Sequence, residues 1–268
     1  ELGRRQCRFP SVLRIWSWNT LSRPRFTKMS GEEVLIPDDI AFSNFKSECN
    51  SDEGWSLTYN KSGITVWIQI LEEEKSLHKI KMPTILSVFY SAFHSLPSPV
   101  EGKCPKPLRN RDVITLRSWL PIGNDYIIMN YSVKHPKYPP KKDMVRAVSI
   151  QTGYLIQSNG PSSCTLTYLA QVDPRGSLPR WVVNKSSQFL APKAMKRIGK
   201  ACLKYAEWKL RHSPGYKPWL YPEQSPLVTI PLSELSVQHA DSLENIDESS
   251  LSEGKDDRAE HSDEDAPN

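Results

Sequence analysis

Two adjacent charged residues, Arg111 and Asp112, precede a segment in which polar and apolar side chains alternate. The alternation predicts a strand that carries Arg117 and Trp119 on one face, together with Thr115. If that face lines an internal space, the guanidinium and the indole are ligand contacts; if it does not, they are ordinary sheet packing. Arg111 and Asp112 allow the same two interpretations, because an Arg-Asp pair beside a strand is often a structural pair. The sequence therefore offers binding chemistry here without fixing the role of each residue.

The histidines and cysteines form no catalytic or metal-binding pattern. The six histidines are scattered, and none is spaced to act with a serine and an aspartate, so an ester hydrolase is disfavoured. No CxxC pair or histidine cluster indicates a metal site. The odd number of widely spaced cysteines is typical of reduced thiols in the cytoplasm rather than of a disulfide framework. We expect a protein that is not an enzyme and has no cofactor.

A long helix is predicted to begin near Pro179, after a turn that ends at Gly176. Pro192 lies inside this helix and should kink or break it, because proline removes a backbone donor. The residues expected on its buried side are Ala194, Ile198, Ala201, Cys202 and Tyr205. The residues expected on its opposite, basic side are Lys193, Lys196, Arg197, Lys200 and Lys204. This basic side is either a membrane-docking surface, worth up to about 1 kcal/mol per charge on an anionic membrane, or a solvated helix face.

Four strands are predicted ahead of that helix, and their short connections favour an antiparallel meander. They span 112–120, 126–133, 144–158 and 164–172, with Gly153 permitting a bulge or bend. Earlier in the chain, the pattern predicts a helix over 37–49, strands over 54–59, 64–70 and 77–81, and a short helix that carries Ile85, Phe89, Phe93 and Leu96.

Charge is distributed unevenly along the 268 residues: +6 over 1–28, +10 over 29–222 and −11 over 223–268. A basic body with an acidic tail suits an anionic surface, and no zinc-ligand spacing or RNA-binding signature favours nucleic acid. The arm 1–28 precedes an ordinary start at Met29 and is expected to be disordered or non-native. No apolar run has the roughly 20 residues of a membrane helix. We expect a cytoplasmic protein with transient membrane association.

The tail 223–268 is rich in Ser, Asp and Glu and is predicted to be disordered. Ser262 precedes three acidic residues, the pattern read by acidophilic protein kinases, and Ser250 is a weaker candidate with Glu253 three residues on. Phosphate would add about −1.5 to −2 charges. The tail would then fold back on the basic helix or repel anionic membrane; the alternative is an inert solubilising tail.

Several sequence words resemble the StAR-related lipid transfer (START) domain family, in particular its phosphatidylcholine-transfer subgroup. They include GWSLTY at 54–59, GITVW at 63–67, NRD at 110–112, YLIQ at 154–157 and LPRW at 178–181. The resemblance implies a domain over 36–212 with an α+β helix-grip fold. In that fold a curved, nine-stranded antiparallel sheet surrounds a hydrophobic tunnel closed by the C-terminal helix. It also implies phospholipid as cargo, carried between membranes.

The chain departs from this family over 82–102, which replaces a block holding two short helices and about two strands. That block includes the family's buried Arg/Asp pair, which holds the lipid phosphate. The chain resembles a splice variant in this respect. The alternative to a carrier is therefore a lipid sensor or scaffold without net transfer. The resemblance also places the choline cage at Val113 and Ile150, near Thr152. Neither aliphatic side chain offers a π face, so ethanolamine should be tolerated beside choline.

Overall fold

The computed structural model of the chain describes residues 34–70, 78–86, 101–102, 104, 106–211, 214–216, 221, 224 and 231–252. The predicted arm 1–28, the predicted helical residues Phe89, Phe93 and Leu96, and Ser262 lie outside these residues. Ile85 lies inside them, in a strand rather than in the predicted helix.

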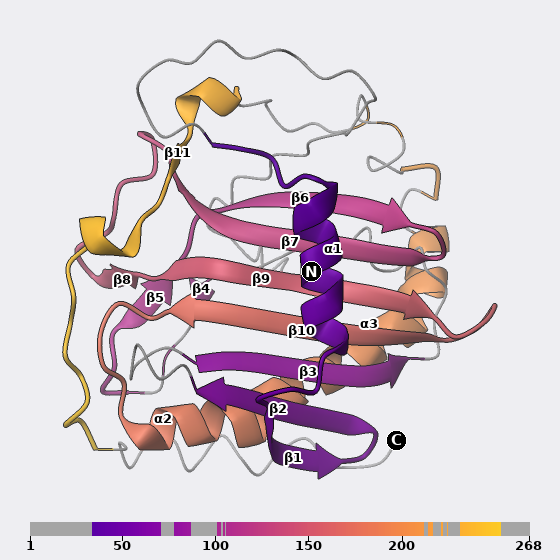
Figure 1. The fold of residues 1–268 in the computed structure, drawn as a ribbon, viewed down its shortest axis with the longest axis horizontal. Coiled ribbons are helices and arrows are strands. Elements are labelled where there is room, and N and C mark those ends of the chain that lie inside the picture. The colour runs from indigo at the N-terminus through magenta and orange to yellow at the C-terminus, as the bar shows by residue number, and fades with distance from the viewer. Residues whose placement is uncertain are drawn as a thin grey trace, which may run out of the picture.

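The fold is built around an antiparallel sheet of eight strands (Figure 1). Its order is β1-β2-β3-β10-β9-β7-β11, with β6 pairing to β7. The strands are β1 Ser56–Lys61, β2 Ile64–Ile70, β3 His78–Leu86, β6 Thr115–Ile122, β7 Asp125–Lys134, β9 Val148–Ser158, β10 Cys164–Asp173 and β11 Ser236–Val237. A small second sheet contains β4 Glu101–Gly102, β5 Asn110–Asp112 and β8 Met144–Arg146. The resemblance implied a sheet of nine strands, whereas the main sheet described here has eight. One of the eight, β11, comes from the C-terminal segment.

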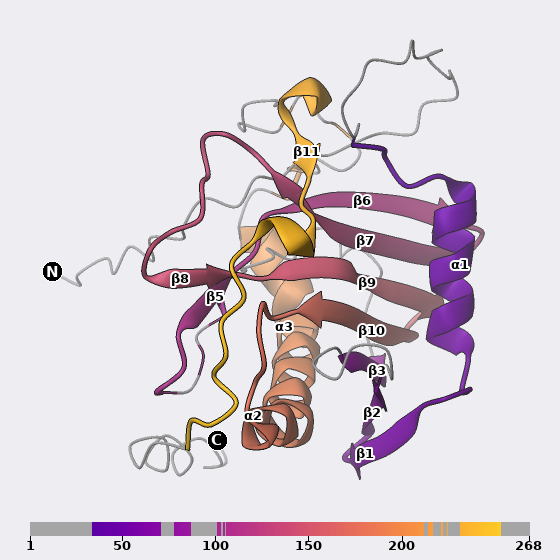
Figure 2. The same cartoon turned by 60° about the vertical axis from the view of Figure 1, so that its left-hand side comes forward.

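Helix α1, Asp39–Asn50, lies across one face of the main sheet (Figures 1 and 2). Asp38 caps it by accepting a hydrogen bond from the Ala41 amide at 2.8 Å. Phe42 and Phe45 are fully buried against the sheet. Ile40, also apolar, is 69% exposed, because it points away from the face that carries the two phenylalanines.

The opposite face is covered by the C-terminal helix, whose segments are α2, Arg180–Lys185, and α3, Ala191–Arg211 (Figure 2). A π-helical turn, Ser186–Leu190, joins them immediately before Pro192. The predicted irregularity is confirmed. Pro192 has no N–H, so the α-helical hydrogen-bond ladder is interrupted, and the turn before it is wider than an α-helical turn. The buried stripe includes Ala191, Met195 and Cys202, whereas Ala194 and Ala201, predicted to be buried, are exposed.

The strand predicted over 144–158 is divided into β8 and β9, because its first residues pair with β5 in the small sheet and the rest with β7 and β10. The irregularity predicted at Gly153 lies instead at Ile150. Ser149 and Gln151 pair with adjacent residues of β10, which leaves Ile150 without a partner in that register. Gly153 is regular, and it serves a different purpose: a Cβ there would lie 2.3 Å from the Ile128 carbonyl oxygen and 2.6 Å from Phe45 Cζ.

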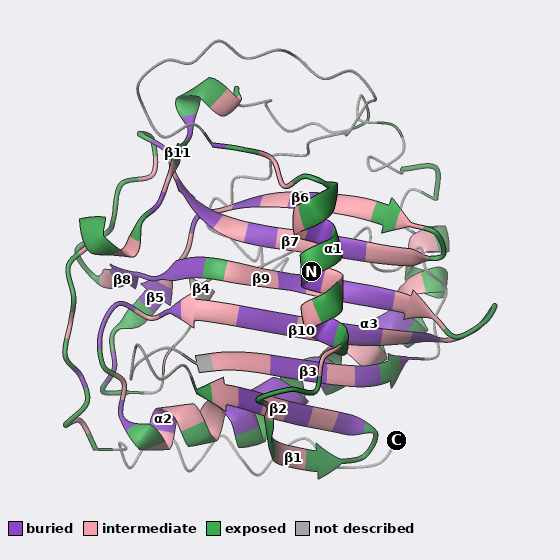
Figure 3. Cartoon of the chain, viewed as in Figure 1, coloured by how far each residue is buried: buried purple, intermediate pink, exposed green. Residues whose placement is uncertain are grey.

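The C-terminal residues 232–252 lie against the body of the domain, although the sequence predicted a disordered tail over 223–268. They contain two 3₁₀ turns, Leu232–Glu234 and Ala240–Ser242, on either side of β11. Figure 3 shows buried and half-buried positions along this segment, and Leu235 and Glu248 are among the buried residues.

Candidate functional site

The face of the main sheet that is covered by the C-terminal helix is called the inner face below. In the β6–β7 register, Trp119 lies opposite Ile128, and Arg117 lies opposite Asn130. Residues directly opposite each other in antiparallel strands project to the same side. Ile128 packs against the buried cluster that contains Met195 of α3, so this side is the inner face. The structure therefore places Arg117 and Trp119 on the face that meets the helix.

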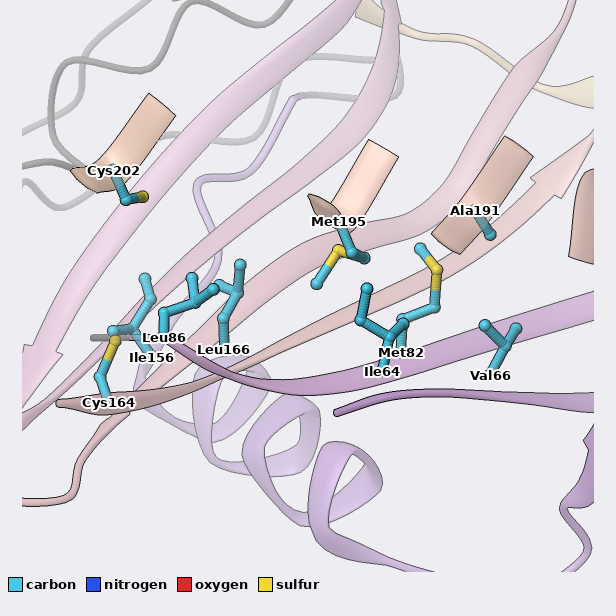
Figure 4. Close-up of a cluster of buried hydrophobic side chains, with 10 residues drawn as sticks. All are labelled: Ile64, Val66, Met82, Leu86, Ile156, Cys164, Leu166, Ala191, Met195 and Cys202. Carbon is cyan, nitrogen blue, oxygen red and sulfur yellow. The ribbon is translucent and has the colours of Figure 1, made fainter. Parts of the chain in front are cut away.

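Most of the inner face is apolar. Figure 4 shows Met195, which projects from α3 toward Met82 and Ile64 of the sheet, while Cys202 and Cys164 lie at the other end of the same layer. The buried members of this cluster are Ile64, Val66, Met82, Leu86, Ile156, Cys164, Leu166, Ala191, Met195 and Cys202. Such a layer removes hydrocarbon surface from water at about 25 cal/mol per Å², and it suits an aliphatic ligand.

A polar group of residues interrupts the apolar layer where β6, β7 and β9 run side by side. Arg117 Nε donates a hydrogen bond to Asn130 Oδ1 at 2.7 Å, and Asn130 Nδ2 donates to the Thr152 carbonyl at 3.4 Å. Ser149 Oγ donates to Thr152 Oγ1 at 2.8 Å. A guanidinium fixed beside hydroxyl groups is suited to an anionic oxygen such as that of a phosphodiester.

Two tyrosines lie next to this polar group. The rings of Tyr154 and Tyr168 have centroids 5.0 Å apart and planes inclined by 43°. Burial raises the pKa of both phenols, and the charge of Arg117 acts in the opposite direction on each. The phenols therefore stay protonated at neutral pH and retain their O–H donors beside the guanidinium.

The chain as a whole is similar to known proteins. The family model for the START domain matches residues 99–209. The chain is 58% identical to mouse START domain-containing protein 10, over 89% of this chain and 91% of that protein. The chain belongs to the START domain family. The crystal structure of human STARD10, at 58% identity, aligns with a TM-score of 0.70 over 78% of this chain and 98% of that one. Mouse phosphatidylcholine transfer protein is 23% identical over 56% of this chain and 85% of its own length.

Arg111 and Asp112 of this START chain lie in the small sheet and have structural partners. Arg146 donates two hydrogen bonds, each 2.9 Å long, to the Asp112 carboxylate. Arg111 Nη2 lies 2.6 Å from Glu248 Oε2, in a pair whose side chains are 8% and 6% exposed. These partners favour the structural interpretation of both residues over ligand contact.

Val113 and Ile150, where the resemblance partly places the choline cage, differ in their exposure. Val113 is half-buried between β5 and β6. Ile150 is 43% exposed at the irregularity in β9. Thr152, by contrast, belongs to the polar group on the inner face through its contact with Ser149.

The five basic residues predicted for one side of α3 face solvent. Lys193, Lys196, Arg197, Lys200 and Lys204 are exposed, as predicted for the side opposite the buried stripe. The sequence analysis missed the apolar side chains beside them: Leu203 is 69% exposed and Leu210 is 74% exposed. A surface that combines cations with exposed leucines is typical of helices that lie at a membrane surface.

Two further observations concern membranes and phosphorylation. Within the described part of the chain, no helix is long and apolar enough to cross a membrane.

Ser250 is exposed in a turn between Glu248 and Leu251, both of which contact the domain body. The sequence did not indicate the contact between this C-terminal segment and the domain.

Proposed function

We propose that this chain binds one phospholipid between the inner face and the C-terminal helix and transfers it between membranes. The observation that carries the proposal is the position of Arg117, a cation on a helix-covered and mostly apolar face, beside two protonated phenols. The mouse relative named phosphatidylcholine transfer protein supports the choice of cargo.

The two parts of the inner face match the two parts of a phospholipid. Acyl chains gain about 0.8 kcal/mol for each methylene that leaves water, so the apolar layer around Met195 and Leu166 supplies most of the affinity. We assign the phosphodiester to Arg117, in the polar group that also contains the hydroxyl groups of Thr152 and Ser149.

The headgroup is proposed to be choline or ethanolamine. Selective recognition of a quaternary ammonium needs aromatic faces. The positions that the family resemblance assigns to this cage carry Val113 and Ile150, which are aliphatic. Phosphatidylcholine and phosphatidylethanolamine are therefore both accepted as cargo, and no bond of the lipid is broken, so neither a nucleophile nor a cofactor is required.

Membrane contact is assigned to the exposed basic side of α3, together with Leu203 and Leu210. Binding there is peripheral and transient, as expected for a cytoplasmic carrier that must leave each membrane again. Phosphorylation of Ser262 or Ser250 by an acidophilic kinase adds negative charge and opposes docking on an anionic surface.

The test measures lipid content and transfer in the full chain, using Arg117→Met and the exposed control Arg180→Met. Native mass spectrometry should show phosphatidylcholine and phosphatidylethanolamine on the wild type. Arg117→Met should lower bound lipid and vesicle-to-vesicle transfer at least tenfold, since a charged hydrogen bond is worth about 1.5–3 kcal/mol. Arg180→Met should behave as wild type. Folded wild-type protein without bound lipid contradicts the proposal, and bound lipid without transfer favours a sensor.

A further inference from the structure

The C-terminal segment 232–252, called the strap below, follows a continuous path along one side of the domain (Figures 1 and 2). It begins at the edge of the main sheet, where β11 pairs with the end of β7 and the Gln238 amide donates to the Ser132 carbonyl at 3.3 Å. Leu235 is buried there with Leu116 and Val133. This end of the strap is anchored by apolar burial and by main-chain pairing.

The middle of the strap crosses the connection between β10 and α2. Arg175 Nη2 donates to the Leu243 carbonyl at 2.7 Å, and the Ile246 amide donates to the Arg175 carbonyl at 3.2 Å. Gly176 has a φ of +127°, and a Cβ at this position would lie 1.6 Å from the Ile246 carbonyl oxygen. Only a residue without a side chain allows the two backbones to approach so closely.

The far end of the strap reaches the first turn of the C-terminal helix. The Glu248 amide donates to the Ser177 carbonyl at 3.1 Å, and the Trp181 indole N–H donates to the Leu251 carbonyl at 2.8 Å. The Glu248 carboxylate accepts from the Arg109 amide at 3.0 Å and pairs with Arg111. The strap therefore joins the sheet, the small sheet and the start of α2.

The buried charge of Glu248 couples its contact with Arg111 to the rest of the strap. Its side chain is 6% exposed, and that of Arg111 is 8% exposed. Glu248 Oε2 and Arg111 Nη2 lie 2.6 Å apart and have no other partner in the described residues, so each depends on the charge of the other. Separation of two such groups leaves two desolvated charges, which is strongly unfavourable unless the whole strap leaves and water enters.

We propose that the strap is an autoinhibitory latch that holds the C-terminal helix against the inner face. Residues 174–179 connect β10 to this helix. The strap forms hydrogen bonds with this connection and with Trp181 in the first turn of the helix. Release of the strap frees the start of the helix, lets it move away from the apolar layer and speeds exchange of the lipid. The effect on exchange rests on the proposed function, whereas the hold on the helix does not.

The experiment measures hydrogen exchange of the backbone amides in the full chain. The variants are Glu248→Ala, which removes the buried carboxylate, and Trp181→Phe, which keeps an aromatic ring but removes the indole donor. The matched control is Glu244→Ala, which removes an exposed carboxylate from the same strap. Glu248→Ala should raise exchange of the α2 amides about 10- to 100-fold, with β9 unchanged. Trp181→Phe should give a smaller increase in α2, and Glu244→Ala none.

Lipid transfer is measured on the same proteins with phosphatidylcholine vesicles. Faster transfer by Glu248→Ala and Trp181→Phe than by Glu244→Ala supports the latch. If the strap amides lose protection while those of α2 do not, the strap does not hold the helix and the inference is overturned. A freed helix with an unchanged transfer rate overturns the autoinhibitory role. If no variant transfers lipid and the wild type does not either, the proposed function fails, while the amide measurement still decides the hold on the helix.

Discussion

Glu248 lies 2.6 Å from Arg111, and this contact joins the C-terminal segment to the small sheet. Both side chains are buried, so water screens the pair little. The same carboxylate also accepts a hydrogen bond from the Arg109 amide. A residue in an acidic segment thus neutralises a charge that would otherwise be buried alone in the domain.

Replacement of one partner of this pair should be costly for stability. Arg111→Ala is expected to lower the free energy of unfolding by about 3–5 kcal/mol, because it leaves the Glu248 carboxylate buried without a counter-charge. Chemical denaturation measures the change. Glu207→Ala, which breaks an exposed pair with Arg211 on α3, is the control and should cost about 0.5 kcal/mol or less. Equal costs for the two variants would contradict the assignment of a desolvated pair.

Gly153 should not tolerate a side chain. Gly153→Ala is expected to destabilise the protein by about 1–3 kcal/mol, because the added methyl meets the Ile128 carbonyl and the ring of Phe45. Thermal unfolding measures the loss. Gly215→Ala, where a methyl would have no neighbour within 4 Å, should leave the melting temperature unchanged. If Gly153→Ala melts as the wild type does, α1 does not pack on the sheet as described.

The buried thiol of Cys202 should be protected from alkylation. Burial, followed by the nearby Cys164, raises its pKa from 9.0 to about 11. At pH 8 the thiolate fraction is then about 100-fold below that of the unfolded chain, and iodoacetamide labelling should be slower by at least that factor. Mass spectrometry of the labelled peptide, with and without denaturant, checks this.

The same shift predicts a loss of stability in alkali. The unfolded thiol releases its proton near pH 9, before the folded one does, so the contribution of the protonated Cys202 is complete below pH 9 and is lost as the pH rises to about 11. Cys202→Ala should therefore show a shallower fall in stability between these values. If stability falls as steeply in Cys202→Ala as in the wild type, the loss is due to groups other than Cys202.

Charge on α3 should govern binding to anionic vesicles. Replacement of the five exposed cations from Lys193 to Lys204 by glutamine is expected to weaken binding to phosphatidylserine vesicles at least tenfold, at up to about 1 kcal/mol per charge. The loss should shrink at high salt. A control that replaces Lys61, Lys137 and Lys142, all exposed elsewhere, should have a smaller effect per charge. A similar effect per charge at both places would argue for attraction by net charge alone.

Features that arise from local periodicity could be predicted from the amino-acid sequence. Alternation over the predicted strand 112–120 was sufficient to put Arg117 and Trp119 on one face, because successive side chains in any strand point to opposite sides. In the same way, three- and four-residue spacing identified Cys202 as buried and Lys196 as exposed on the long helix. The position of Pro192 predicted the interruption of that helix, because its missing N–H acts within one turn.

Three features follow from long-range packing and could not be predicted: which face of the sheet meets the helix, why residue 153 is a glycine, and whether the C-terminal segment is ordered. Each depends on a neighbour that is distant in sequence: Met195 for the face of Arg117, and Phe45 for Gly153. The strap has the composition of a disordered tail: it has too few apolar residues to bury a core of its own. It is ordered because Arg111 and Trp181 supply the charge and the donor that its own residues lack.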